Sequence, residues 1–290
     1  MKAQLIYNKA ERVRDVLRYI SRFKNSIIVI HIDDSLVDSP FYSSHIRDIA
    51  YLHEVGLKVI IVPGAKKHID TLLNNAGLQW KEIDGIRITS EKEMSIIKMA
   101  SFDMSNKIMT SLAEEHLTAV IGNWVKARGK GVINGIDFQS AGEIDKINIP
   151  ALNAILEEGF IPIFPCIGWS SNGKPYNISS INLAAQVATE LKAEKLFFLT
   201  HGKQISNEDF FIPDNISISP DGFVPAFSLE ELDAFLELNE NLGNFSIEKK
   251  HIINLLKIAK TSCSLGVSRT HIVSGLFDGT LPCEIFSDLG

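Results

Sequence analysis

The sequence has few cysteines, no excess of positive charge and no long run of apolar residues. Its three cysteines, Cys166, Cys263 and Cys283, are odd in number and far apart. They predict reduced thiols, a cytoplasmic location and no metal site, because Cys-x-x-Cys and metal-ligand spacings are absent. The formal net charge is −6, so nucleic-acid binding has no electrostatic support. No apolar run could span a bilayer and no signal-peptide pattern begins the chain, so no membrane association is expected.

What the 290 residues do contain is an ordinary globular balance, 45% hydrophobic and 22% charged. There is no internal repeat and no low-complexity segment. This length supports one large α/β domain or two lobes.

The most informative stretch runs from Gly159 to Thr200. Phe160 to Pro165 is a short apolar run, typical of a buried strand, and Asn172-Gly173 is a strong hairpin signal. Apolar residues then repeat at helical spacing from Ile181 to Leu191, and Leu196 to Leu199 is a second buried strand. Strand, helix and strand within about 40 residues predict a crossover unit of a parallel sheet. The predicted fold is a three-layer α/β sandwich with a mostly parallel central sheet.

Other segments carry simpler signals. A capping box at Ser90 and Glu93 predicts the start of a long helix. Residues 123–138 are basic and rich in glycine, which predicts an exposed hairpin. Further strands are predicted at Ile27–Ile32, Leu57–Val62, Thr118–Ile121 and Gly266–Val273.

Two motifs flank the central helix: Gly173 with Tyr176-Asn177-Ile178 before it, and Lys192-Ala193-Glu194-Lys195-Leu196 after it. This order resembles the amino-acid kinase family, in the branch of N-acetylglutamate kinase and the kinase-like domain of N-acetylglutamate synthase. The resemblance runs from about Val16 to Gly290. It implies an amino-acid kinase-like domain over 25–290, with an N-lobe at about 25–180 for the acetylated amino acid. The C-lobe, about 181–290, would correspond to the nucleotide side, and residues 1–24 would form an N-terminal helix.

The resemblance implies a substrate pocket that includes Gly64, Ala65, Arg87 and Asn177. Gly64-Ala65 begins a turn similar to that of the synthase-like domains, and a strand, glycine turn and helix form an anion cradle. Arg87 matches an arginine that holds a substrate carboxylate by a planar fork. Asn177 matches an asparagine that contacts the acetylated amino acid. Without the resemblance, a lone arginine on an edge strand is about twice as often solvated as ligand-binding.

The phosphoryl-transfer positions depart from the family pattern. His31-Ile32-Asp33-Asp34 stands where the kinases carry Lys-x-Gly-Gly, whose lysine and glycines accommodate phosphate. Each carboxylate ~4 Å from a phosphate charge costs about 4 kcal/mol at an effective dielectric near 20. Ile181 stands where the kinases carry an aspartate that organises the catalytic lysines. The second phosphoryl-binding lysine of the kinases would fall near Leu255. Kinase activity is predicted to be absent, with no cofactor.

Two alternatives to a phosphoryl-transfer site that has lost its activity remain. Asp33 and Asp34 could hold Mg²⁺ together, since paired carboxylates do so, or form a solvated turn or helix cap. The chain could also be an active acetylglutamate kinase with a divergent phosphate site, and ATP and Mg²⁺ are expected only in that case.

An arginine site is implied at the two ends of the chain. Val16 to Phe23 resembles the N-terminal helix that interlaces subunits and supplies a tyrosine in arginine-inhibited kinases, and Tyr19 matches that tyrosine. His271, Glu284 and Gly290 keep the spacing of the arginine-site histidine, glutamate and glycine. L-arginine is therefore expected between residues 10–23 and 271–290 of a homo-oligomer. The plainer interpretations are that residues 10–23 form a helix packed on the domain edge, that His271 is a core histidine and that Glu284 is a solvated charge.

The predicted function is that of an N-acetylglutamate synthase-type domain in arginine biosynthesis. It would bind L-arginine as feedback effector, with N-acetylglutamate as a further ligand. In full-length synthases an acetyltransferase domain follows, so the chain is expected to be part of a larger enzyme, with an acetyltransferase domain or subunit as partner, or a free-standing sensor. A third interpretation is an amino-acid-binding scaffold for another enzyme's subunits.

Overall fold

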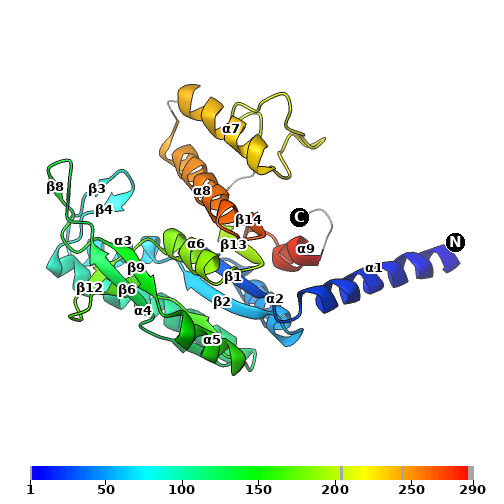
Figure 1. Cartoon of the computed structure of the whole chain (residues 1–290), viewed down its shortest axis with the longest axis horizontal. Helices are drawn as coiled ribbons and strands as arrows, with labels where there is room; N and C mark the ends of the chain where they lie inside the picture. Colours follow the sequence, from blue (N-terminus) through cyan, green and yellow to red (C-terminus); the bar gives the residue numbers. More distant parts are fainter. Residues whose placement is uncertain (1, 203–204, 243–244, 287–290) are drawn as a thin grey trace.

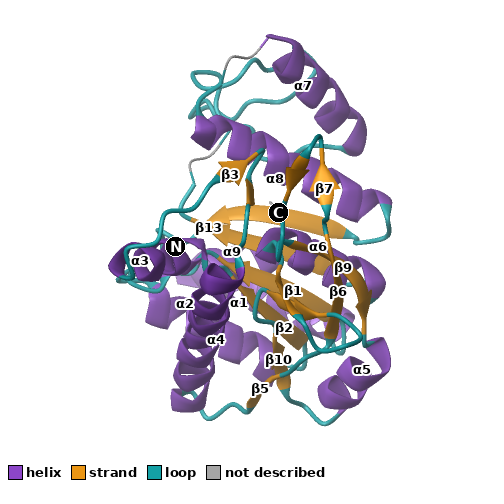
Figure 2. Ribbon diagram, turned by 90° about the vertical axis from the view of Figure 1, so that its left-hand side faces the viewer, coloured by secondary structure: helices purple, strands orange, loops and turns teal. Residues whose placement is uncertain are grey.

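The computed structural model describes residues 2–202, 205–242 and 245–286. Its centre is a six-stranded sheet with the order β14-β13-β1-β2-β10-β5, in which every neighbouring pair is parallel (Figures 1 and 2). The strands are β1 (Ile27–Ile32), β2 (Lys58–Pro63), β5 (Ala119–Ile121), β10 (Ile161–Ile163), β13 (Lys195–Thr200) and β14 (Arg269–Ser274). The predicted parallel α/β sheet is therefore confirmed. The crossover from β10 to β13 spans two intervening strands, β1 and β2.

Helices cover the sheet, and a smaller four-stranded sheet with the order β12-β11-β6-β9 lies beside it. Its strands are β6 (Val125–Gly129), β9 (Gly142–Ile147), β11 (Ile167–Trp169) and β12 (Pro175–Asn177). Two hairpins pair β3 (Glu82–Ile83) with β4 (Ile86–Arg87), and β7 (Val132–Ile133) with β8 (Ile136–Asp137). The helices are α1 (Lys2–Phe23), α2 (Tyr42–Glu54), α3 (Lys66–Asn75), α4 (Glu91–Glu114), α5 (Ile149–Glu157), α6 (Ser180–Glu190), α7 (Leu229–Leu242), α8 (Ile247–Ser264) and α9 (Thr280–Phe286), with a 3₁₀ turn η1 (Asp34–Leu36).

The core lies on both faces of the central sheet. Successive side chains of β1 point to opposite faces, so Val29 packs in one cluster with Leu183 of α6. Ile28 and Ile30 pack in the other cluster with Ile49 of α2. Because helices bury both faces, β1 and β2 can be apolar almost throughout, which is why the sequence revealed them.

One sequence interpretation is wrong in part. Residues 123–138 were expected to form an exposed hairpin, but Trp124 and Val125 are buried. The cause is β6, which joins the second sheet and carries these side chains into the core, where the Trp124 and Phe164 ring centroids lie 4.9 Å apart. The exposed hairpin is β7–β8, where Val132 is 67% exposed.

Helix α1 begins earlier than the predicted Ala10 and projects from the body of the molecule (Figure 1). Val13 and Leu17 on the predicted apolar face are 58% and 57% exposed, whereas Phe23 at the end of the helix is buried. Its contacts with the body include α9. Among the described residues, no helix is long and apolar enough to cross a membrane.

Candidate functional site

Strands β1 and β2 end side by side, and the segments after them carry the predicted phosphoryl and substrate residues. The Gly64 N–H donates to the Ile32 carbonyl at 2.7 Å. A Cβ on Gly64 would lie 3.2 Å from the Asp34 nitrogen and 3.3 Å from that carbonyl oxygen. This close approach of two backbone turns favours glycine at position 64. The ends of neighbouring parallel strands are also where open α/β sheets bind ligands.

The carboxylate of Asp34 occupies the amino end of α3. Asp34 Oδ2 accepts the His68 N–H at 2.8 Å, and the side chain is buried. The N-cap residue of α3 is Ala65, which makes no side-chain cap bond, so Asp34 caps the helix from a separate segment. Burial raises the pKa of Asp34, while the backbone N–H of His68 lowers it. The predicted anion cradle therefore already contains a carboxylate of the chain itself.

Asp33 is engaged elsewhere. Its Oδ1 accepts the N–H of Ser35 at 2.9 Å, which caps η1. Asp33 and Asp34 thus turn to different partners, as in the helix-cap interpretation. No cluster of three or more His, Cys, Asp or Glu side chains in the described part of the chain could hold a metal ion.

His31 lies in the middle of this edge. Its Nε2 and the Ser180 Oγ at the start of α6 are hydrogen bonded at 3.0 Å, and the ring is buried. Burial lowers the pKa of His31 from 6.5 to about 4, although the charge of Asp33 opposes the change. His31 is therefore neutral at pH 7 and does not supply the positive charge of a lysine.

The remaining phosphoryl positions are apolar. Ile181 of α6 packs against the core cluster that contains Val29 and Leu183, and Leu255 is buried in the same cluster. His251, one turn before Leu255 on α8, interacts electrostatically with His31 and Asp33. Sequence reasoning missed His251 because a single histidine within a helix carries no motif, and counting back from Gly266 led to Leu255 instead.

Arg87 and Asn177 approach each other through Thr89. Asn177 Nδ2 donates to Thr89 Oγ1 at 3.2 Å, and that hydroxyl donates to the Arg87 carbonyl at 3.2 Å. The Arg87 side chain is buried and forms an ion pair with Asp70 of α3. Its guanidinium carbon lies over the Trp80 ring, 4.8 Å from the ring centroid. Thr89 thus links Asn177 to the backbone of Arg87, whereas the Arg87 side chain is directed to α3. Their role in binding, like that of Gly64 and Ala65, stays a prediction.

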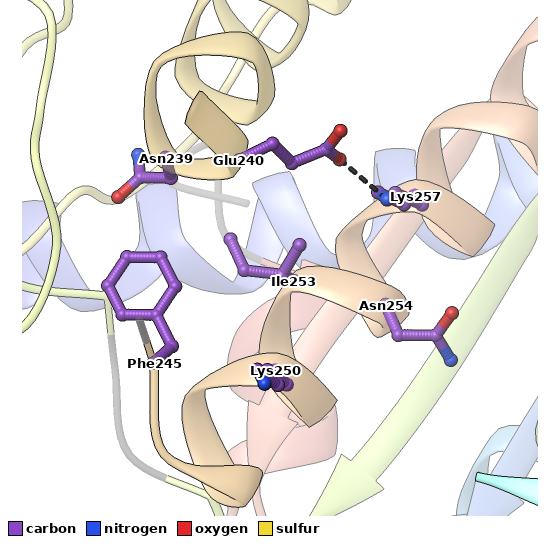
Figure 3. Close-up of a pocket in the computed structure, with 7 residues that line it drawn as sticks. All are labelled: Asn239, Glu240, Phe245, Lys250, Ile253, Asn254 and Lys257. Carbon is purple, nitrogen blue, oxygen red and sulfur yellow. Dashed lines mark ion pairs between the residues drawn. The ribbon is translucent and has the colours of Figure 1, made fainter. Parts of the chain in front are cut away.

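Two cavities lie in the described part of the chain. One, of about 330 Å³, is formed between the start of α4 and the β11–β12 hairpin and includes Ser140, whose carbonyl accepts the Asn177 N–H. The other, of about 280 Å³, lies between α7 and α8, and its lining includes the Glu240–Lys257 ion pair (Figure 3). None of the predicted site residues lines either cavity.

The described residues that are predicted to bind L-arginine lie near the contact between α1 and α9. His271 Nδ1 donates to Glu284 Oε2 at 3.2 Å, and the ring stacks on Phe197 with centroids 4.6 Å apart. Burial lowers the pKa of His271, while its hydrogen bond to Glu284 raises it. The structure therefore places Glu284, which is only partly buried, directly beside His271. Gly290 lies outside the described residues.

Tyr19 and Lys195 connect this region to α1. The Lys195 ammonium lies 5.4 Å from the Tyr19 ring centroid and 6.0 Å from that of Phe23. Glu284 acts electrostatically on Lys195, so the lysine, the glutamate and the end of α1 share one neighbourhood. The sequence did not indicate Lys195 as part of this region, because Lys195 was noted only as a member of the motif at residues 192–196.

Comparison with known proteins gives one family. The model of the amino acid kinase family matches residues 26–263. An acetylglutamate kinase from Campylobacter curvus is 29% identical across 97% of this chain and 95% of its own length. An amino-acid acetyltransferase from Vibrio vulnificus is 30% identical across 93% of this chain and 60% of its own length.

A solved structure agrees with these relatives. The N-acetylglutamate synthase from Neisseria gonorrhoeae, complexed with coenzyme A and L-arginine, is similar with a TM-score of 0.81 and 28% identity. The similarity covers 97% of this chain and 63% of that chain. The same synthase complexed with coenzyme A and N-acetyl-glutamate also gives a TM-score of 0.81. This chain thus spans about three fifths of the synthase and of the Vibrio acetyltransferase, and nearly all of the Campylobacter kinase.

Proposed function

Because this chain belongs to the amino acid kinase family, we propose that it is an arginine-responsive domain of the N-acetylglutamate synthase type, without phosphoryl transfer of its own. The observation that carries the proposal is the Asp34 carboxylate at the amino end of α3. Its role would be in arginine biosynthesis, with L-arginine as effector and N-acetylglutamate as a second ligand. Similarity to a synthase solved with L-arginine supports the effector.

The loss of phosphoryl transfer follows from the charges at the end of β1. Enzymes of this kind stabilise the transferring phosphoryl group mainly by positioning and positive charge. Here the edge offers a neutral His31 and the carboxylates of Asp33 and Asp34. A phosphate charge ~4 Å from one carboxylate is repelled by about 4 kcal/mol at an effective dielectric near 20. Displacing Asp34 would also leave α3 without its cap.

An acyl-phosphate assay tests this part. The purified chain, given N-acetylglutamate and Mg-ATP with hydroxylamine as trap, should form no acyl hydroxamate above the background without protein. The second candidate is an active acetylglutamate kinase, which the similarity to nearly all of the Campylobacter kinase favours. Turnover at an ordinary kinase rate, ~1 to 100 per second, would establish the kinase and refute our proposal.

The proposed arginine site lies between α1 and the His271–Glu284 pair. Glu284 can accept two hydrogen bonds from a guanidinium, and it is only partly buried. His271 is held by Phe197 and keeps Glu284 in place through its Nδ1. Tyr19 would close the site from the α1 side, as its position beside Lys195 suggests.

Calorimetric titration with L-arginine tests the site. A charge-assisted pair contributes about 1.5 to 3 kcal/mol, so Glu284→Gln should weaken binding roughly 10- to 100-fold. Glu143→Gln is the matched control, because Glu143 pairs with Arg128 on the second sheet, away from α1. Equal affinity of both variants, or no heat from the unaltered chain at millimolar arginine, would contradict the proposed site.

The exposed apolar face of α1 supports a homo-oligomer. Val13 and Leu17 are more than half exposed although they lie on the apolar stripe of the helix. Leu17→Glu should therefore lower the mass measured by light scattering, whereas Arg14→Glu, on exposed helix surface, should not. An unchanged mass for Leu17→Glu would remove α1 as the contact. Stable mixed complexes with another enzyme's subunits would instead favour a scaffold.

A further inference from the structure

The turn between β14 and α9, residues 275–279, is held against the start of α2 by two hydrogen bonds. Ser44 Oγ donates to Asp278 Oδ1, and His45 Nε2 donates to the Gly275 carbonyl at 2.8 Å. Because a carbonyl oxygen only accepts hydrogen bonds, Nε2 carries the hydrogen of this buried ring. The contact of the turn with α2 is therefore made by polar groups.

Asp48 lies one turn further along α2, beside this contact. Its Oδ2 is buried without a hydrogen-bond partner among the residues that the structure describes. Burial, together with the charge of Asp278, raises the pKa of Asp48 from 3.8 to about 6, although His45 and Arg47 act in the opposite direction. The ionised form of Asp48 is thus disfavoured while the turn is packed on α2.

Other charged groups near this contact are engaged elsewhere. Arg47 lies 3.6 Å from Glu115, just beyond α4, and the two form an ion pair. Glu284 of α9 is hydrogen bonded to His271 at 3.2 Å. Asp278 therefore supplies the carboxylate that opposes ionisation of Asp48 from the other side of the contact.

We propose that Asp48 and Asp278 form a pH-sensitive switch that controls the contact between α2 and residues 275–279. Protonation of Asp48 keeps the turn on α2, and loss of that proton favours release of the turn, because two carboxylates then face each other. The turn leads directly into α9, the helix that carries Glu284. The inference goes beyond the proposed function and requires no ligand.

The direction of the pH dependence follows from the pKa of Asp48 in the two forms. Release returns the carboxyl group to water and to its ordinary pKa of 3.8, whereas the packed form has a pKa of about 6. The packed form therefore binds the proton more tightly, and its advantage is lost as the pH rises through 6. Between pH 5 and pH 8 these values correspond to a change of about 10-fold in the equilibrium between the packed and released turn.

Amide hydrogen exchange of the full chain at pH 5, 6, 7 and 8, corrected for the intrinsic rate at each pH, tests the switch. Protection of residues 275–286 should fall about 10-fold from pH 5 to pH 8 relative to that of α6, which lies outside this contact. Asp48→Asn removes the titrating carboxyl group and should abolish the fall. A merely structural role of Asp48 would change protection equally at every pH.

Two further variants make the experiment specific. Asp278→Asn keeps an oxygen that accepts the Ser44 hydroxyl but removes the opposing charge, so the fall should be smaller. It also provides the readout if Asp48→Asn does not fold. Glu54→Gln is the matched control, because it removes a carboxylate from the exposed far end of the same helix and should keep the full fall.

The outcomes decide the switch without reference to L-arginine. Equal protection of residues 275–286 at pH 5 and pH 8 in the unaltered chain overturns it. An undiminished fall in Asp48→Asn or in Asp278→Asn overturns it as well. Since no ligand is added, failure of the switch is distinct from failure of the proposed arginine site.

Discussion

Lys195 is expected to destabilise the fold at neutral pH. It begins β13 with 5% of its surface exposed, and burial lowers its pKa from 10.5 to about 8, with Arg269 acting in the same direction. Because the folded pKa is the lower one, the unfolded chain binds more protons between about pH 8 and 10.5. The free energy of unfolding should therefore rise with pH through that window.

The size of the effect follows from the two pKa values. The pKa of Lys195 differs between the unfolded and folded chain by 10.5 − 8 = 2.5. Since a pKa difference of one corresponds to about 1.4 kcal/mol, the cost is about 3 kcal/mol. The rings of Tyr19 and Phe23 stabilise the ammonium by about 0.5 to 2 kcal/mol, which offsets part of that cost. Lys195→Met, which keeps the apolar stem, should therefore raise the free energy of unfolding at pH 7 by about 1 to 2 kcal/mol.

Urea denaturation at pH 7, 8, 9 and 10 measures both effects. The unaltered chain should become more stable as the pH rises, and Lys195→Met should lack that rise. Lys126→Met, at an exposed position of β6, is the control for loss of a charge. A Lys195→Met variant that is less stable than the unaltered chain at pH 7 would refute the reasoning, because the aromatic rings would then outweigh burial.

Three smaller predictions concern stability and use urea denaturation at pH 7. Asp34→Ala should lower the free energy of unfolding by about 1 to 2 kcal/mol through loss of the α3 cap, and inorganic phosphate should then raise the melting temperature of the variant only. Ser90→Ala should cost about 1 kcal/mol, because it breaks the capping box with Glu93; no loss would mean that the helix start is held by packing alone. Gly275→Ala should cost about 1 to 3 kcal/mol, since its Cβ would lie 2.4 Å from Leu36 Cδ1, and an unchanged midpoint would mean that Leu36 moves freely.

Local patterns predicted the parts of the fold that depend on neighbours in sequence. The apolar run Ile27–Ile32 gave β1 with its observed bounds, and the Ser90–Glu93 capping box gave the start of α4. Contacts between distant segments carried no such signal. The cap of α3 comes from Asp34, and the partner of Arg87 comes from Asp70. The pairing of these charges depends on how separate elements meet, which the sequence does not encode locally.

The proposed arginine region and the phosphoryl edge lie at different points of one strand pair. In the parallel register of β1 and β13, Ile28 lies opposite Lys195 and His31 opposite Phe198. Lys195 belongs to the proposed arginine region and His31 to the phosphoryl edge, so three residues, about 10 Å of strand, separate them. At that edge Asp33 is hydrogen bonded to Ser35 and Asp34 to α3, and His31 Nε2 is hydrogen bonded to Ser180, while His31 Nδ1 is buried without a partner among the described residues. Because both carboxylates find hydrogen-bond donors within the chain, we expect the edge to keep its structure without bound phosphate, and a domain with the proposed function could retain the whole sheet.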